Sequence, residues 1–139
     1  MKQYLLDASS FIMLIKKGTV QTTVACLQDS LVLDLTFYEV GNAIWKEIIL
    51  TKFLTPDDAK ALEKVAQTIF ARTDQIASST ESFSGILEIA KNEKLSFYDS
   101  SYIYFAKEKG LKLVTEDKKL NVKAQKYVDV QTATTLIAP

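Results

Sequence analysis

The stretch 95-LSFYDSSYIYFAKEKGLKLVTEDKKL-120 indicates the fold, because it contains a helix pattern, a stop signal and a buried strand in succession. The helix is expected over about 97–109. Gly110 follows it and can adopt the left-handed conformation that ends many helices. The run 111–115 is nearly continuously apolar, which is typical of a strand covered on both faces. A helix leading directly into such a strand is the repeating unit of a parallel α/β protein.

The rest of the chain repeats this alternation. Further buried strands are predicted at 3–7, 31–35 and 127–132. Helices are predicted at about 9–16, 20–28, 37–51, 55–72, 81–92 and 118–126. Strands separated by helices imply right-handed crossovers. The predicted fold class is therefore α/β: a three-layer α/β/α sandwich with a central, mainly parallel sheet of four to five strands. We expect one domain over residues 1–139.

Composition narrows the possible chemistry. The 17 basic and 17 acidic side chains give a formal net charge of zero, so any nucleic-acid contact must come from a local patch. Cys26 is the only cysteine, which suits a reducing cytoplasm, and no segment reaches the roughly 20 apolar residues of a membrane span. The sequence has no histidine, which excludes Ser-His-Asp and Cys-His catalysis. Acid–base or metal chemistry would fall mainly to carboxylates.

Four acids from distant parts of the chain are expected at one edge of the sheet. Asp7 closes the first predicted strand and Asp117 follows the third, while Glu39 and Asp99 lie near the starts of helices. Ligands of open α/β sheets bind beyond the carboxyl ends of the strands, which is the edge where these residues fall. One explanation is that each acid caps its own helix. The other is that the acids share a cation.

Convergence of carboxylates has an electrostatic cost that favours the second explanation. At an effective dielectric of about 20 and a separation of about 4 Å, each pair costs on the order of 4 kcal/mol. A cation between the acids, or proton uptake by some of them, removes this cost. A site with oxygen ligands only suits Mg²⁺ or Mn²⁺. Hydrolysis of a phosphodiester is the natural reaction, since it needs charge neutralisation and a water nucleophile but no protein nucleophile.

Four segments resemble the acidic motifs of PIN-domain ribonucleases, and most closely those of the small prokaryotic VapC-type toxins. They are DASSFI (7–12), TFYEVGNAIWK (36–46), SFYDSSYIYFAKEKG (96–110) and LVTEDKKL (113–120). The resemblance covers essentially the whole chain and implies a PIN-like domain that binds Mg²⁺ or Mn²⁺ and cleaves RNA. By motif match it makes Asp7, Glu39, Asp99 and Asp117 the catalytic, metal-binding acids. Ser9 and Thr115 match hydroxyl positions beside them.

Charge and position suggest roles within this set. Asp7 and Asp99 are expected to hold the main metal, with Asp117 close by, and Glu39 to hold a second metal or orient the attacking water.

The four neighbouring polar residues each keep two interpretations. Ser9 and Thr115 either support the ligand carboxylates or bond within local turns. Glu116 either adds a ligand or faces solvent. Asn42 either faces the site or packs against a neighbouring helix.

The predicted function is that of a metal-dependent endoribonuclease that hydrolyses RNA phosphodiester bonds. The resemblance further implies the toxin role in a VapBC-type toxin–antitoxin system, a homodimer, and a small antitoxin that covers the acidic groove. Lysines near the acidic edge, such as Lys16, Lys46 and Lys119, are candidate phosphate contacts. Aromatic residues of the 97–109 helix either stack on bases or form core.

Two other functions remain as alternatives. A PIN fold can act as a catalytically silent binding or scaffold module. A receiver-like phosphoacceptor signalling domain is disfavoured, because no strand ends in a candidate phosphoacceptor between Asp7 and Asp99 and because Asp34 is predicted to lie inside a strand.

Overall fold

A parallel sheet forms the middle of the molecule in the computed structural model, which describes residues 1–52 and 54–138. Its strands are β1 (Tyr4–Leu6), β2 (Ser30–Leu33), β3 (Asp74–Ile76), β4 (Lys112–Val114) and β5 (Val130–Gln131). Their order across the sheet is β3-β2-β1-β4-β5, and every pairing is parallel. The first strand of the chain is therefore the central one, flanked by β2 and β4. This places the residues that follow β1 and β4 next to each other.

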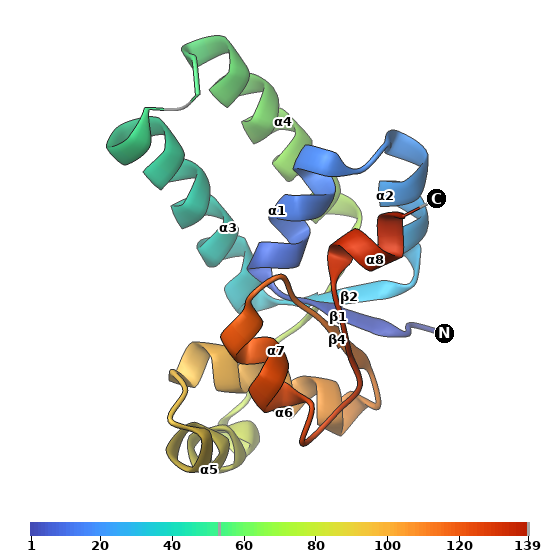
Figure 1. The fold of residues 1–139 in the computed structure, drawn as a ribbon, viewed down its shortest axis with the longest axis vertical. Helices are drawn as coiled ribbons and strands as arrows, with labels where there is room; N and C mark the ends of the chain where they lie inside the picture. The colour runs from blue at the N-terminus through green and yellow to red at the C-terminus, as the bar shows by residue number, and fades with distance from the viewer. Residues whose placement is uncertain (53, 139) are drawn as a thin grey trace.

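Helices cover both faces of this sheet, as Figure 1 shows. On one side lie α1 (Ala8–Lys17), α2 (Val20–Gln28), α3 (Asp34–Lys46), α4 (Pro56–Arg72) and α8 (Ala133–Ile137). On the other side lie α5 (Phe83–Glu93), α6 (Phe97–Lys109) and α7 (Lys118–Ala124). A π-helical segment, Glu47–Thr51, continues α3, and a short 3₁₀ turn, Thr80–Ser82, precedes α5. The predicted three-layer α/β/α class is confirmed.

The core has two halves because successive strand residues point to opposite faces. Leu5 and Leu6 of β1 are both fully buried, but they belong to different clusters. Leu5 packs with Tyr102 and Ile103 of α6, whereas Leu6 packs with Phe11 of α1. The central strand is thus clamped from both sides, which fixes the position of its carboxyl end. Within residues 1–52 and 54–138, no helix is long and apolar enough to cross a membrane.

The structure corrects several predicted boundaries. Strand β3 was not predicted, because Asp74 and Gln75 are exposed at the edge of the sheet and leave no apolar run. The predicted strand over 127–132 shortens to two residues. Asp34 does not lie inside a strand but begins α3, where its carboxylate accepts hydrogen bonds from the Leu35 N–H at 2.8 Å and the Ser78 N–H at 2.9 Å. Helix α8 was also not predicted.

Candidate active site and metal centre

The candidate site lies at the carboxyl edge of the three central strands. Asp7 immediately follows β1, and its N–H donates to the carbonyl of Val114, the last residue of β4, at 3.1 Å. Asp117 lies just beyond β4, at the start of α7. Glu39 lies in the second turn of α3, which follows β2, and Asp99 lies in the first turn of α6. The four acids therefore come from four elements.

The Asp7 carboxylate is buried and bonded at both oxygens. Only 5% of the residue is exposed. Its Oδ1 accepts from the Ser10 N–H at 2.9 Å and from the Ser9 hydroxyl at 2.7 Å, while Oδ2 accepts from the Thr115 hydroxyl. Burial raises the pKa of Asp7 above its ordinary value of 3.8, and these hydrogen bonds work in the opposite direction. Asp7 therefore caps α1 and also faces the loop after β4.

Ser9 and Thr115 connect Asp7 to the loop that carries Asp117. The Ser9 hydroxyl accepts from the Glu116 N–H at 3.0 Å, and the Thr115 hydroxyl accepts from the Asp117 N–H at 3.0 Å. Asp117 in turn caps α7, because its Oδ1 accepts from the Leu120 N–H at 2.9 Å. The two hydroxyl groups thus donate to one predicted ligand and position the backbone of another. Their part in metal binding stays a prediction.

Glu39 does not take part in a capping box. Thr36 lies in the first turn of α3, and the Thr36 hydroxyl accepts from the Leu33 N–H at 3.1 Å. The Glu39 carboxylate instead accepts from the Tyr102 hydroxyl at 2.7 Å. Burial raises the pKa of Glu39, and the negative charges of Asp99 and Asp7 raise it further, against the effect of the Tyr102 bond.

Asp99 lies in the first turn of α6 but does not cap that helix. The cap of α6 is Ser96, whose hydroxyl accepts from the Asp99 N–H at 3.0 Å. Burial raises the pKa of Asp99, and the charges of Asp117 and Asp7 add to the increase, while Lys119 partly offsets it. Asp7 and Asp99 thus act electrostatically on Glu39, and Asp7 and Asp117 act on Asp99. The structure places the four acids at the same edge of the sheet.

The capping explanation holds for Asp7 and Asp117, whereas the shared cation stays a prediction. Asp7 Oδ1 accepts two hydrogen bonds and its Oδ2 accepts one, so Oδ2 keeps a lone pair for another partner. Within residues 1–52 and 54–138, no three Asp, Glu, His or Cys side chains are arranged so that they could hold a metal ion together. The donor set nevertheless fits a hard divalent cation, since it consists of oxygen atoms with excess negative charge. Mg²⁺ and Mn²⁺ are the ions that this chemistry suits.

The remaining predicted residues lie differently. Glu116 is directed to α8, where its Oε1 accepts from the Thr134 N–H at 3.0 Å and from the Thr134 hydroxyl at 3.2 Å. This contact links the loop after β4 to the C-terminal helix. Asn42 is exposed on α3, three residues after Glu39.

Two residues beside the site were not identified from the sequence. Tyr102 was assigned to base stacking or core, but its hydroxyl bonds to Glu39 although only 1% of the residue is exposed. Thr36 bonds to the same hydroxyl at 2.8 Å. Tyr102 follows Asp99 by three residues and therefore lies on the same side of α6. That spacing was the available signal.

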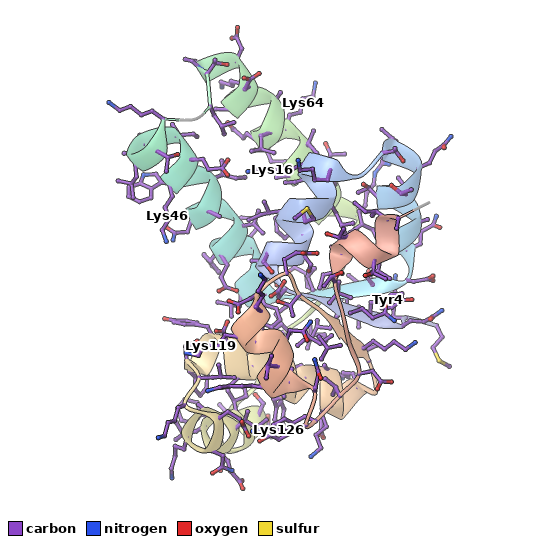
Figure 2. The ribbon with its side chains drawn as sticks, in the orientation of Figure 1. Tyr4, Lys16, Lys46, Lys64, Lys119 and Lys126 are labelled. Carbon is purple, nitrogen blue, oxygen red and sulfur yellow. The ribbon has the colours of Figure 1, made fainter. Side chains whose placement is uncertain are left out.

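The candidate lysines lie on both sides of the sheet. Figure 2 shows Lys119 on the side that α6 and α7 cover, whereas Lys16 and Lys46 lie toward the ends of α1 and α3 that point away from the sheet. Lys16 forms an ion pair with Glu47, whereas Lys119 is close enough to lower the pKa of Asp99. Lys119 is therefore the candidate phosphate contact that the structure supports best.

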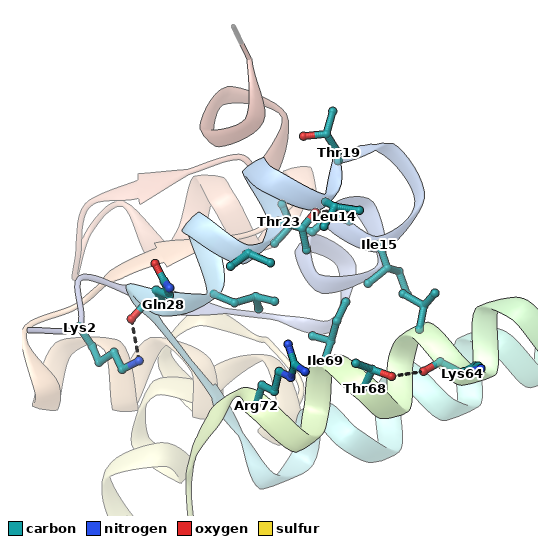
Figure 3. Close-up of a pocket in the computed structure, with 15 residues that line it drawn as sticks. Lys2, Leu14, Ile15, Thr19, Thr23, Gln28, Lys64, Thr68, Ile69 and Arg72 are labelled. Atoms are coloured by element: carbon teal, nitrogen blue, oxygen red, sulfur yellow. Dashed lines mark hydrogen bonds between the residues drawn. The ribbon is translucent and has the colours of Figure 1, made fainter.

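A large cleft lies elsewhere, between α1, α2 and α4 (Figure 3). Its volume is about 770 Å³, and no Asp or Glu occurs among the described residues that line it. Leu14 and Ile69 contribute apolar walls, while Lys2, Lys64 and Arg72 add positive charge. A cleft without carboxylates cannot be the metal site. It is a second feature, distinct from the acidic edge.

Comparison with known proteins gives consistent matches. Residues 4–126 match the PIN domain family. The chain is 33% identical over 130 residues to "Exonuclease VapC9" of Pyrobaculum aerophilum, an alignment that covers 94% of this chain and 92% of that protein. The crystal structure of PAE2754 from Pyrobaculum aerophilum superposes with a TM-score of 0.83 at 29% identity and covers 98% of this chain and 94% of the other.

Two more distant structures show the same fold. FitAcB from Neisseria gonorrhoeae superposes with a TM-score of 0.60 at 19% identity, over 94% of this chain and 98% of that one. FitAB, solved bound to an IR36 DNA fragment, superposes with a TM-score of 0.64 at 16% identity, over 94% and 95% of the two chains. At these identities the likeness concerns the arrangement of the elements. The four acids described above lie at the carboxyl edge of that arrangement.

Proposed function

We propose that this chain, which belongs to the PIN-domain family, is a Mg²⁺- or Mn²⁺-dependent endoribonuclease of the VapC type. The observation that carries the proposal is the convergence of Asp7, Glu39, Asp99 and Asp117 from four elements. The charges of Asp99 and Asp7 add to the raised pKa of Glu39, and those of Asp117 and Asp7 add to the raised pKa of Asp99. Perturbed carboxylates at one edge of a sheet are typical of a functional site. The coupling is what a cation would relieve.

The proposed roles follow from the contacts. Asp7, Asp99 and Asp117 would hold the divalent cation, and Glu39 would hold a second one or orient water. The cation, when bound, would neutralise charge on the phosphate and make water a better nucleophile. Ser9 and Thr115 fix the direction of the Asp7 carboxylate. Because the pKa of Glu39 is raised, its carboxylate is a stronger base than an ordinary glutamate.

Lys119 completes the proposed arrangement on the substrate side. It is exposed on α7, and it lowers the pKa of Asp99 through its positive charge. A cation at that position can contact a phosphate next to the one being cleaved. The protein as a whole has no net charge, so such local contacts would provide the attraction to RNA.

A cleavage assay on linear and circular RNA tests the proposal. We expect the purified protein to cut both RNAs in Mg²⁺ or Mn²⁺, and the cutting to stop in EDTA. A circular RNA has no ends, so only an endonuclease can cut it. The test matters because the Pyrobaculum relative is named an exonuclease. Asp99→Asn should be inactive. Asp129→Asn is a matched control, because Asp129 is an exposed aspartate that precedes β5 at the opposite edge.

Two results would contradict parts of this proposal. Cleavage of linear RNA alone would exclude endonucleolytic action. A folded protein that cuts neither RNA with any divalent ion would instead favour a PIN-fold binding module without catalysis.

The proposed biological role is that of the toxin in a toxin–antitoxin pair, held inactive by a small antitoxin in the cytoplasm. The cleft between α1, α2 and α4 supports this partner, since apolar walls with Lys64 and Arg72 suit an amphipathic segment that carries acidic side chains. We also propose a homodimer. Trp45, Ile49 and Leu50 expose apolar surface on α3 and the π-helical segment that continues it.

Each partner has its own test. Co-expression with a small protein encoded beside this chain should yield a complex that Ile69→Glu in the cleft disrupts and Asn42→Asp outside it does not. Sedimentation equilibrium of the isolated chain should give the mass of two copies. A monomer at all concentrations would exclude the homodimer.

A further inference from the structure

A chain of buried hydrogen bonds leads from the backbone to one of the site acids. The Thr36 hydroxyl accepts from the Leu33 N–H at 3.1 Å and lies 2.8 Å from the Tyr102 hydroxyl. The Tyr102 hydroxyl donates to Oε1 of Glu39 at 2.7 Å. Thr36 is fully buried and Tyr102 is 1% exposed. Water therefore does not compete for the two bonds that Thr36 makes, while the bond to Glu39 is partly buried.

The direction of each bond is determined by its ends. A backbone N–H can only donate, so the Thr36 oxygen is the acceptor in the first bond. The Tyr102 proton is used in the bond to Glu39. The Thr36 proton must therefore be donated to the Tyr102 oxygen. All donors and acceptors in the chain are satisfied in one consistent direction, which ends at the carboxylate.

We propose that Tyr102 and Thr36 are positioning residues that hold Glu39 in its working orientation. This inference rests on the proposed function, in which Glu39 is a site acid. A glutamate has a long side chain with several rotatable bonds, and by itself it would lose conformational entropy on meeting a metal or water. Tyr102 bonds to one oxygen of Glu39 in advance and leaves the other oxygen for the site.

The location of the two partners adds a second constraint. Tyr102 belongs to α6, the helix that carries Asp99, whereas Glu39 belongs to α3 on the other side of the sheet. The hydroxyl contact therefore joins the two helices at the carboxyl edge. It fixes the distance and orientation of the Glu39 carboxylate relative to that of Asp99, whose charge raises the pKa of Glu39. Loss of the Tyr102 hydroxyl should let the Glu39 carboxylate move relative to Asp99 while both acids remain present.

A purely structural role for Tyr102 makes a different prediction. Its ring packs with Leu5 in the core, and the ring of a phenylalanine at position 102 would pack in the same way. If the hydroxyl only satisfied a buried acceptor, its removal would change stability and leave metal binding and turnover unchanged. The distinction therefore requires measurements other than the melting temperature.

The test compares Tyr102→Phe with the wild-type chain. Loss of an outer contact of this kind reduces metal affinity or activity by about 10- to 100-fold. We expect the dissociation constant for Mn²⁺, measured by titration calorimetry without RNA, to rise by about tenfold. We expect kcat to fall by about 10- to 100-fold with little change in KM. Tyr104→Phe is the matched control, because Tyr104 lies on the same helix and packs over Gly85 instead.

Thr36 provides an independent pair of variants. Thr36→Val removes the hydroxyl at nearly constant volume, and Thr36→Ser keeps it. We expect the valine variant to show the Tyr102→Phe defects in milder form and the serine variant to restore wild-type values. This pair decides the question even if Tyr102→Phe fails to fold.

The possible outcomes separate the two proposals. If Tyr102→Phe and Thr36→Val match the wild type in Mn²⁺ affinity and kcat while Asp99→Asn is inactive, the positioning role is wrong and the nuclease proposal stands. If Asp99→Asn and Glu39→Gln cleave RNA normally, both proposals fail. Selective loss in the hydroxyl-free variants, with normal behaviour of Tyr104→Phe, supports the inference.

Discussion

The starts of α1 and α6 place the same residue type in two different situations. Asp7 is itself the cap of α1, is 5% exposed, and accepts bonds from Ser9, Ser10 and Thr115. At α6 the capping is done by Ser96, so that the half-buried Asp99 carboxylate is not needed for it. Asp7 stabilises the fold and is also a proposed site acid. Asp99 is a proposed site acid that has no capping role, and its charged form is disfavoured by burial and by neighbouring acids.

The largest expected effect is one that both acids share. Asp7→Asn and Asp99→Asn should each reduce RNA cleavage by at least about a hundredfold, the usual scale for loss of a group that stabilises transition-state charge. Initial rates on a short fluorescent RNA at saturating Mg²⁺ measure this. Asp129→Asn, at the opposite edge of the sheet, should retain the wild-type rate. A normal rate in either site variant would remove that residue from the catalytic set.

Removal of Asp7 and removal of Asp99 should change the free energy of unfolding in opposite directions. Asp7→Ala leaves the buried Ser10 N–H and Thr115 hydroxyl without their acceptor, so the free energy of unfolding should fall by about 1–3 kcal/mol. Asp99→Ala removes repulsion and should raise it, by no more than about 1 kcal/mol because the group is partly screened by solvent. Urea unfolding in EDTA measures both. Changes of the same sign would mean that the division of roles described above is wrong.

The pH dependence should sharpen the same contrast on a smaller scale. The raised pKa of Asp99 means that the folded state binds its proton more readily than the unfolded chain does. The stability contributed by protonated Asp99 is therefore complete below the ordinary pKa of 3.8 and is lost as the pH rises through the raised value. Metal-free Asp99→Asn should exceed the wild type in stability at pH 7, and the margin should shrink toward pH 4.

This margin is measured by urea unfolding of both proteins in EDTA across that pH range. The comparison with the wild type cancels groups such as Asp34, whose pKa is lowered and whose contribution has the opposite sign. A margin that does not change with pH would show that Asp99 is not electrostatically strained.

The parts of the fold that could be predicted are those where burial leaves a pattern in the sequence. The central strand β1 is an apolar run because both its faces are covered. The helix 97–109 has the bounds expected from Ser96 and Gly110. Strand β3 could not be found in this way, because an edge strand with exposed Asp74 and Gln75 has no apolar run. Helix α8 is too short, at 5 residues, to show a period.

The site follows the same division. The acids were predictable because parallel strands bring their carboxyl ends to one edge, whatever the distance along the chain. The contact between Tyr102 and Glu39 was not, because an aromatic residue at helical spacing looks like core and Tyr102 is also core. The direction of Glu116 toward Thr134 depended on α8, which the sequence did not reveal. Side-chain contacts between elements require the packing of the elements to be known.

The central claim is that Asp7, Glu39, Asp99 and Asp117 surround a common divalent cation. Anomalous diffraction from a crystal soaked in Mn²⁺ tests it most directly. We expect a strong Mn²⁺ peak among these four carboxylates, which disappears in a soaked crystal of Asp99→Asn. An empty acidic edge in the wild-type crystal, with Mn²⁺ bound elsewhere or not at all, would contradict it.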